Sequence, residues 1–164
     1  MPRTLPQALA FLLGFALVLW LSPFSGSAEP AELELEARVH ASVEALRRER
    51  SLRPLPRDEA LDRVARAHSR DMVRRGYLAH ETPEGRGPVE RLHAAGVEGF
   101  RLAGENIGQS SAGDPVAAIV AGWQASPSHR ENLHSPPWNA TGVGAARARD
   151  GSLVVTQVFA SFPR

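Results

Sequence analysis

Two β-rich runs near the C-terminal end constrain the fold of this chain more than any other feature. The runs cover 141–149 and 152–159, and Asp150-Gly151 joins them. An Asp-Gly pair between such runs predicts a type I′ turn and therefore an antiparallel hairpin. Helical patterns precede this hairpin. Because helices come first and strands come late, the sequence predicts an α+β layered domain rather than a doubly wound parallel sheet.

Three helices with recognisable ends are expected before the hairpin. The first covers 33–50, where apolar residues recur at steps of three and four. The second begins after Asp58, which can cap it, and ends before Gly76, which suits the position after a helix. The third begins at Asp114-Pro115, a cap followed by a proline in the first turn. Shorter elements are expected over 88–95 (helix), 102–109 (strand) and 128–133 (one helical turn).

An apolar run lies close to the N-terminal end. Leu9 to Leu21 follow Arg3 and precede small residues that end at Ala28. This order predicts a signal peptide over 1–28, since the run is shorter than the roughly 20 residues that span a bilayer. An uncleaved membrane anchor is the alternative. We expect a linker over 29–35 and one domain over 36–164, secreted or extracytoplasmic, or held at the membrane by the apolar segment.

Charge and cysteine content exclude several classes of partner and chemistry. The net charge of the chain is +1, which gives no electrostatic reason to expect nucleic acid as a partner. Membrane contact is expected only if the N-terminal segment stays uncleaved. The sequence contains no cysteine, which excludes disulfide bonds, thiol nucleophiles and cysteine-ligated zinc. The domain must therefore be held together by its core.

Familiar catalytic motifs are missing from the sequence. It contains no H-E-x-x-H, no P-loop and no G-x-S-x-G. The residues left as candidates for chemistry are His80, Glu105 and His129, each beside turn-forming or small residues. Glu105 lies in a strand-like, largely apolar stretch, where a buried carboxylate needs a partner. His68 lies on the apolar stripe of the second helix and is expected to be a core residue.

Several segments, in a fixed order, resemble one known family. They are Leu61–Met72 (L-x-x-x-A-x-x-H-S-x-D-M), Gly76–His80, Gly104–Ile107, Trp123–Leu133, Gly142–Gly144 and Thr156–Phe159. In these segments the chain resembles the CAP/SCP superfamily of cysteine-rich secretory, antigen-five and pathogenesis-related proteins. It looks most like the bacterial, cysteine-free branch. The resemblance covers about residues 36 to 162 and implies a three-layer α-β-α sandwich with a short antiparallel central sheet and a central cleft.

The resemblance also implies a functional cleft. In eukaryotic relatives two His and two Glu face this cleft and can hold a divalent metal. His80 and Glu105 match the first His and the Glu of the G-E-N segment. The second family Glu corresponds to Ser126 here and the second family His to Val154, so the tetrad is incomplete. His129, in the S-P-x-H-R segment, is the expected replacement for the second imidazole.

From this resemblance we expect His80, Glu105 and His129 to form the cleft and its candidate metal site. Two imidazoles and a carboxylate suit zinc, the one candidate cofactor. Asn106, Ser126 and Gln157 are expected to line the same cleft as ligand-contacting or supporting residues.

Three functions remain open at this point. The first, which we favour, is a binding module for a divalent metal or for a lipid or other cell-envelope ligand. The second is a metal-assisted hydrolase, of peptidase or esterase type, with Glu105 as general base. The third is a structural domain whose polar cluster binds no ligand. The missing nucleophile motifs weigh against the enzyme but leave the small molecule, lipid or envelope partner unidentified.

Overall fold

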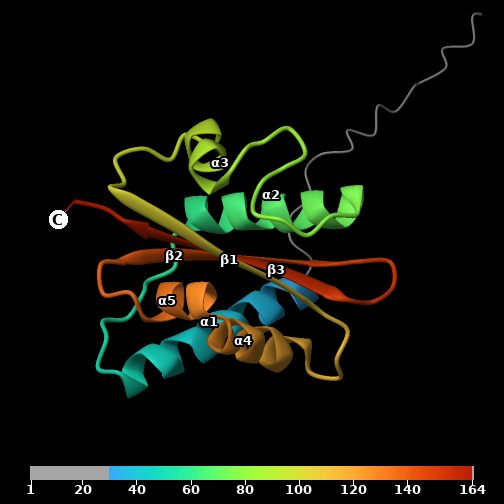
Figure 1. Cartoon of the computed structure of the whole chain (residues 1–164), viewed down its shortest axis with the longest axis horizontal. Coiled ribbons are helices and arrows are strands. Elements are labelled where there is room, and N and C mark those ends of the chain that lie inside the picture. The colour runs from blue at the N-terminus through green and yellow to red at the C-terminus, as the bar shows by residue number, and fades with distance from the viewer. Residues whose placement is uncertain (1–29, 164) are drawn as a thin grey trace, which may run out of the picture.

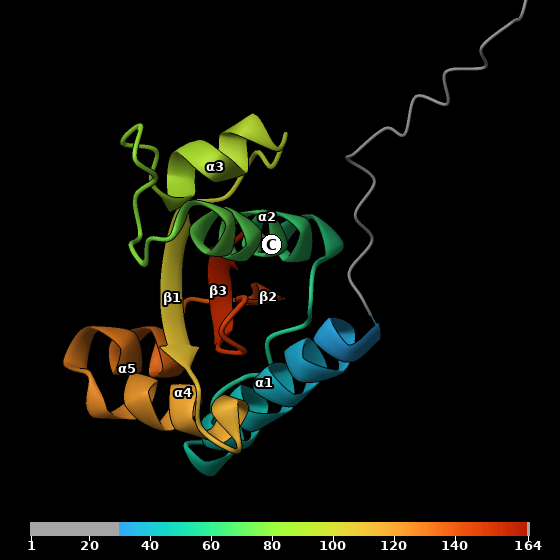
Figure 2. The same ribbon diagram turned by 90° about the vertical axis from the view of Figure 1, so that its right-hand side faces the viewer.

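The computed structural model describes residues 30–163, which form helical layers on both faces of a small sheet (Figure 1). Helices α2 (Glu59–Arg75) and α3 (Pro88–Ala94) cover one face. On the other face lie α1 (Pro30–Glu49), α4 (Pro115–Ala125) and α5 (Pro127–His134) (Figure 2). The predicted α+β class and layered sandwich are confirmed. The predicted signal peptide over 1–28 lies outside the described residues.

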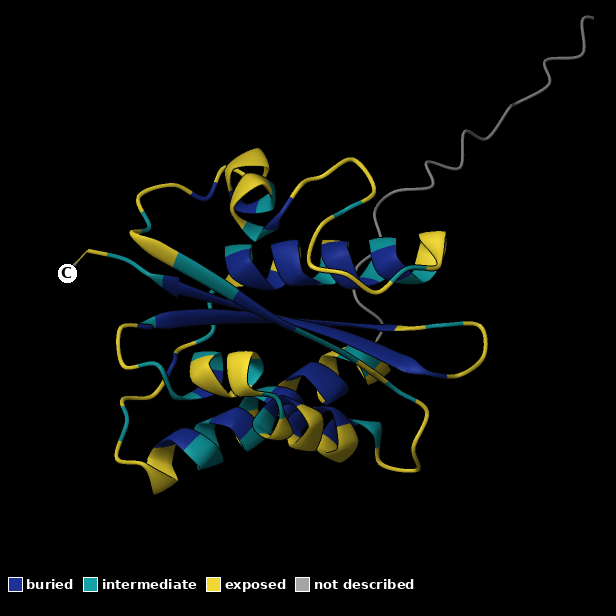
Figure 3. Ribbon diagram, in the orientation of Figure 1, coloured by how far each residue is buried: buried dark blue, intermediate teal, exposed yellow. Residues whose placement is uncertain are grey.

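The sheet contains β1 (Leu102–Ser110), β2 (Ala140–Arg147) and β3 (Leu153–Ser161) in the order β1-β3-β2. Both pairings are antiparallel. The last strand in the sequence is therefore the central one, and it is buried almost throughout, whereas β1 begins at the exposed Leu102 (Figure 3). Within 30–163, none of the helices is both long and apolar enough to cross a membrane.

The hairpin between β2 and β3 is confirmed, but its turn differs from the prediction. A type I′ turn requires positive φ at both central residues. Among the non-glycine residues of 30–163, only Ser51 has positive φ, so Asp150 does not meet this requirement. Instead the N–H of Gly151 donates to the carbonyl of Ala148 at 3.0 Å, and Gly151 has a φ of 84°. The Asp150 carboxylate accepts from the N–H of Ser152 at 2.9 Å, so the loop is longer than two residues.

Helix ends follow the predicted caps, with two differences. Asp58 accepts from the N–H groups of the first turn of α2, and Gly76 ends this helix with a φ of 71°. Asp114 likewise caps α4. The first helix, however, begins at Pro30, so most of the expected linker over 29–35 is helical, because Leu35 already packs in the core. The single turn expected over 128–133 is the complete helix α5.

Helix α2 lies directly on the backbone of β2. A Cβ atom on Gly142 would lie 2.1 Å from the carbonyl carbon of Leu61, and a Cβ on Gly144 would lie 2.0 Å from the backbone nitrogen of Arg66. The Ser69 hydroxyl, on the same helix, donates to the Gly144 carbonyl at 2.9 Å. The two glycines therefore set the distance between helix and sheet.

Carboxylates occupy the outer edge of β2. The N–H of Val143 donates to Asp62 at 2.8 Å, and the N–H of Ala145 donates to Glu36 at 3.3 Å. Glu36 is fully buried and also pairs with Arg66. Helices α1 and α2 thus supply the hydrogen-bond acceptors that a further strand would have provided.

Side chains from α4 and α5 occupy the outer edge of β1 in the same way. Trp123 donates its indole N–H to the Ile107 carbonyl at 2.7 Å. Asn132 donates to the Glu105 carbonyl at 3.1 Å. Trp123 is 2% exposed and belongs to the hydrophobic core. These contacts fix β1, and with it the side chain of Glu105, against both helices.

Candidate functional site

Glu105 on β1 is the centre of a polar cluster. Its side chain is 1% exposed, and both of its oxygens have partners. Nη2 of Arg91 donates to Oε2, and Nδ1 of His80 lies 2.9 Å from Oε1. Nε2 of His68 lies 3.9 Å from the same Oε1. The buried carboxylate thus has the partners that its surroundings require.

Arg91 on α3 joins this carboxylate to the loop before it. Its Nη1 donates to the carbonyls of His80 at 2.7 Å and Arg86 at 3.0 Å. The guanidinium of Arg91 therefore holds both Glu105 and the backbone of His80, whose ring Glu105 orients. Arg91 was not among the predicted site residues, because it lies outside the resembling segments. The expected burial of Glu105 predicted that its carboxylate has a partner, but it did not indicate which residue provides that partner.

His80 and His129 come together from different layers of the fold. Their ring centroids lie 5.8 Å apart, with an angle of 40° between the ring planes. The His80 side chain is 46% exposed, and His129 on α5 is half-buried. Burial, together with the neighbouring imidazole of His80, lowers the pKa of His129. The structure therefore brings together the three residues that the sequence singled out.

The contact with Glu105 fixes the tautomer of a neutral His80. A carboxylate only accepts hydrogen bonds, so Nδ1 carries the proton that lies between the two groups. Nε2 is then left with a lone pair. It can accept a hydrogen bond, bind a metal ion or take up a proton. Glu105 itself is enclosed by its partners and, with a side chain only 1% exposed, is not placed to contact a ligand or a water molecule.

The arrangement does not provide three direct ligands for a metal. Within residues 30–163, no group of three or more His, Asp or Glu side chains is positioned to hold a metal ion. Both oxygens of Glu105 face Arg91 and His80 instead. The expected zinc set of His80, Glu105 and His129 therefore does not fit a three-ligand site, and only the two imidazoles remain as donors.

The other expected cleft residues lie at different depths. Asn106 is fully buried and donates to the His129 carbonyl at 3.0 Å, so it positions α5. Gln157 is also fully buried and donates to the Thr141 hydroxyl at 3.1 Å. Neither is open to a ligand. Ser126 is partly exposed, and its hydroxyl lies 3.4 Å from that of Ser128.

His68 is a core residue, as expected, but it also borders the polar cluster. It is 1% exposed, and its Nε2 donates to the Ala79 carbonyl at 3.0 Å. Burial lowers its pKa. Its distance to Glu105 could not be read from the sequence, because the two residues lie on different elements.

Comparison with known proteins decides the family of this chain. The family described as "CAP: Cysteine-rich secretory protein family" matches residues 40–159. The chain belongs to the CAP family. This CAP domain is 32% identical over 122 residues to the uncharacterized protein YkwD of Bacillus subtilis strain 168. The match covers 74% of this chain but only 46% of YkwD, so the chain spans less than half of that relative.

Solved structures share this CAP fold. An outer surface protein from Borrelia burgdorferi has a TM-score of 0.72 at 22% identity, covering 79% of this chain and 94% of that protein. An extracellular protein containing an SCP domain from Bacillus anthracis has a TM-score of 0.69 at 30% identity, covering 84% of this chain and 45% of that protein. These relatives are bacterial proteins of the cell surface or the extracellular space.

Proposed function

We propose that this CAP domain is an extracytoplasmic binding module that takes a cell-envelope ligand at the paired imidazoles of His80 and His129. One observation carries the proposal: a half-exposed imidazole is fixed by a buried carboxylate, which an arginine with a side chain only 11% exposed holds in turn. A fixed side chain loses little entropy on binding. The predicted signal peptide and the surface or extracellular relatives support the location.

The chemistry of the two rings favours a ligand that donates hydrogen bonds. Nε2 of His80 has no hydrogen-bond partner within residues 30–163, and in the neutral ring it is an acceptor. The lowered pKa of His129 favours its neutral form, in which it too offers a ring nitrogen as an acceptor. Acceptor nitrogens on two adjacent rings suit hydroxyl or amide N–H groups, which saccharide and peptide components of a cell envelope carry.

A calorimetric titration of the full-length protein tests this proposal. Soluble peptidoglycan fragments and zinc chloride are titrated separately into the wild type and into His80→Ala/His129→Ala. Loss of two hydrogen bonds should weaken fragment binding roughly tenfold or more. His93→Ala is the matched control, because His93 is an exposed histidine on α3 that pairs with Glu98. Equal binding by wild type and double variant would refute the site.

The same titration separates the remaining alternatives. Zinc binding that the double variant loses would favour a metal held by the two imidazoles. A double variant that loses stability, with no binding detected even in the wild type, would favour a purely structural cluster.

A hydrolase is the second candidate, with a changed assignment of its base. The contact between Glu105 and His80 orients an imidazole as general bases often are oriented. His80 would then be the base, in place of the predicted Glu105, which is enclosed. Turnover of an ester or peptide panel that His80→Ala abolishes would favour this function. Full turnover in that variant would exclude this role for His80.

A further inference from the structure

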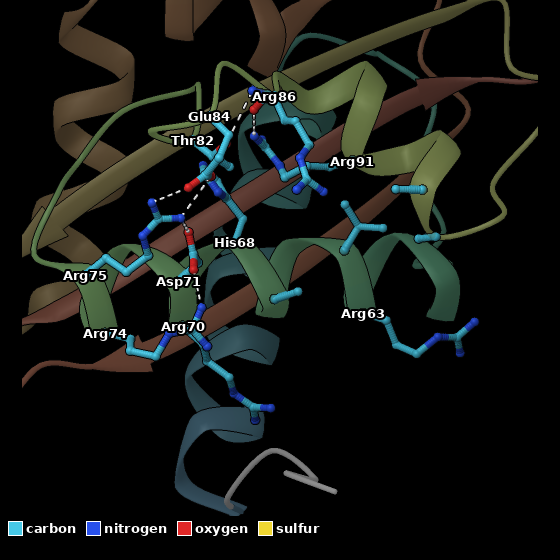
Figure 4. A pocket seen from close by; sticks show the side chains of 14 residues that line it. Arg63, His68, Arg70, Asp71, Arg74, Arg75, Thr82, Glu84, Arg86 and Arg91 are labelled. Carbon is cyan, nitrogen blue, oxygen red and sulfur yellow. Dashed lines mark hydrogen bonds and ion pairs between the residues drawn. The ribbon is translucent and has the colours of Figure 1, made fainter. Parts of the chain in front are cut away.

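A cavity of about 830 Å³ lies between α2, α3 and the loop that joins them (Figure 4). This volume is in the range of small-molecule sites. We call it the α2–α3 cavity. His80, Glu105 and His129 are not among its lining residues, but Arg91 and His68, which border Glu105, are.

The lining of the α2–α3 cavity is strongly basic. Six arginines line it against two acidic residues, Asp71 and Glu84, although the whole chain carries a net charge of only +1. The two acids pair with Arg74 and Arg75 in partly exposed contacts, which contribute little. The guanidinium of Arg86 has no hydrogen bond or ion pair within residues 30–163. The other three, Arg63, Arg70 and Arg91, pair with acids outside the lining, namely Glu59, Glu32 and Glu105. Arg86 is therefore left for an anion, beside arginines such as Arg63 and Arg74 whose exposed ion pairs are weak.

Two buried polar atoms in the wall of the cavity lack partners. They are Nε of Arg91 and Nδ1 of His68. Because Nε2 of His68 donates to a carbonyl, its Nδ1 is an acceptor, whereas Nε of Arg91 is a donor. Buried polar atoms without a partner are rare and costly. A group that can both accept and donate would satisfy the two atoms together.

We propose that the α2–α3 cavity is a second ligand site, which binds a phosphate monoester. A singly protonated phosphate monoester carries acceptor oxygens for guanidinium groups and one O–H for an imidazole nitrogen. The apolar residues Val64, Ala67, Ala94 and Ala95 also line the cavity and would contact the organic part of the ligand. The source is either a soluble organic phosphate or the headgroup of a phosphatidate lipid.

Arg91 connects this cavity to the cleft. Its Nε and the Nδ1 of His68 are closed off from solvent, so the guanidinium must shift toward a phosphate in the cavity before Nε can donate to it. The same guanidinium holds Glu105 and the carbonyl of His80. Occupation of the cavity therefore changes the surroundings of the His80 ring without contact to it.

Calorimetry on the full-length protein tests the site with hexyl phosphate, inorganic phosphate and phosphatidylcholine vesicles with and without phosphatidate. The site variant is Arg74→Gln/Arg86→Gln, two exposed positions whose change leaves the core intact. The control variant is Arg48→Gln/Arg149→Gln, which removes the same charge from exposed positions outside the cavity. We expect saturable binding of hexyl phosphate that weakens roughly tenfold or more in the site variant and stays unchanged in the control.

The outcomes separate the source of the phosphate and the two proposed sites. Tighter binding of hexyl phosphate than of inorganic phosphate supports an organic ligand, and recruitment to phosphatidate vesicles supports the lipid. Phosphate binding should persist in His80→Ala/His129→Ala, even if envelope fragments fail to bind anywhere. Absence of saturable binding, or equal losses in site and control variants, would overturn the phosphate site. An unchanged NMR signal of the His80 ring at saturation would overturn the link through Arg91.

Discussion

Replacing Gly144 by alanine would insert a methyl group where α2 touches the backbone of β2. The new Cβ would lie 2.0 Å from the backbone nitrogen of Arg66 and 2.3 Å from the carbonyl carbon of Ala65. Both are main-chain atoms of the helix, so no change of rotamer relieves the contact. Because non-bonded atoms prefer separations of about 3.5 Å, the helix must retreat by about 1.5 Å.

The structure indicates what such a retreat costs. The Ser69 hydroxyl would leave the Gly144 carbonyl, 2.9 Å away, and Asp62 would leave the N–H of Val143, 2.8 Å away. Overpacking contributes about 2 kcal/mol, and the loss of the two buried hydrogen bonds contributes about 1 kcal/mol each. We therefore expect the free energy of unfolding to fall by about 4 kcal/mol, a large part of the stability of an ordinary domain.

Guanidinium chloride unfolding, followed by far-ultraviolet circular dichroism, measures this loss. Gly122→Ala on α4 is the matched control, since no atom lies within 4 Å of the Cβ that it adds. Alanine favours a helix interior over glycine by about 1 kcal/mol, so the control should be neutral or stabilising. If Gly144→Ala unfolds within about 1 kcal/mol of the wild type, the close approach of α2 to β2 is refuted.

Three further predictions concern the buried polar groups. Glu105→Gln leaves the largely buried guanidinium of Arg91 without a counter-charge, so the free energy of unfolding should fall by about 3 kcal/mol. Urea titrations measure this loss, and a change under about 1 kcal/mol would contradict a stabilising ion pair. Arg47→Met strands the Leu133 carbonyl, now 2.9 Å from Nη1, and should cost about 2 kcal/mol, so an unchanged melting temperature would count against this cap of α5. Burial lowers the pKa of His68 below its ordinary 6.5, so the unfolded chain takes up this proton first as the pH falls. The contribution of His68 to the free energy of unfolding is therefore complete above pH 6.5 and is lost as the pH falls toward the pKa of the folded state. In His68→Gln the free energy of unfolding should decline less steeply over this range. Identical slopes in the variant and the wild type would refute the assignment.

The helix ends could be predicted from the sequence, because they depend on residues that are close together along the chain. Asp58 and Asp114 cap helices by accepting from N–H groups two or three residues ahead, and Gly76 needs only its own positive φ. The turn at Asp150-Gly151 was harder to predict, because the Asp150 side chain can bond to Ser152 and so stabilise a longer loop. Composition alone does not distinguish these two turns.

The sequence predicted several residues of the site, but not the hydrogen bonds and ion pairs between them. The surroundings of Glu105 in the sequence indicated that it needs a partner, His80 and His129 were the other candidates, and the resemblance implied that all three meet in one site. The identity of the second partner, Arg91, depends on how α3 packs beside β1, which no local pattern encodes. Gln157 matched the family segment, yet it lies on the central strand between β1 and β2 and is fully buried.

Within residues 30–163 the sheet has three strands, and side chains meet the free edges of both outer strands where a further strand would pair. Asp62 and Glu36 hold N–H groups of β2, and Asn132 and Trp123 hold carbonyls of β1. A strand from a neighbouring molecule would have to displace these groups before it could join the sheet. The native domain should therefore resist polymerisation into fibres at high protein concentration, although no disulfide bond ties the chain together.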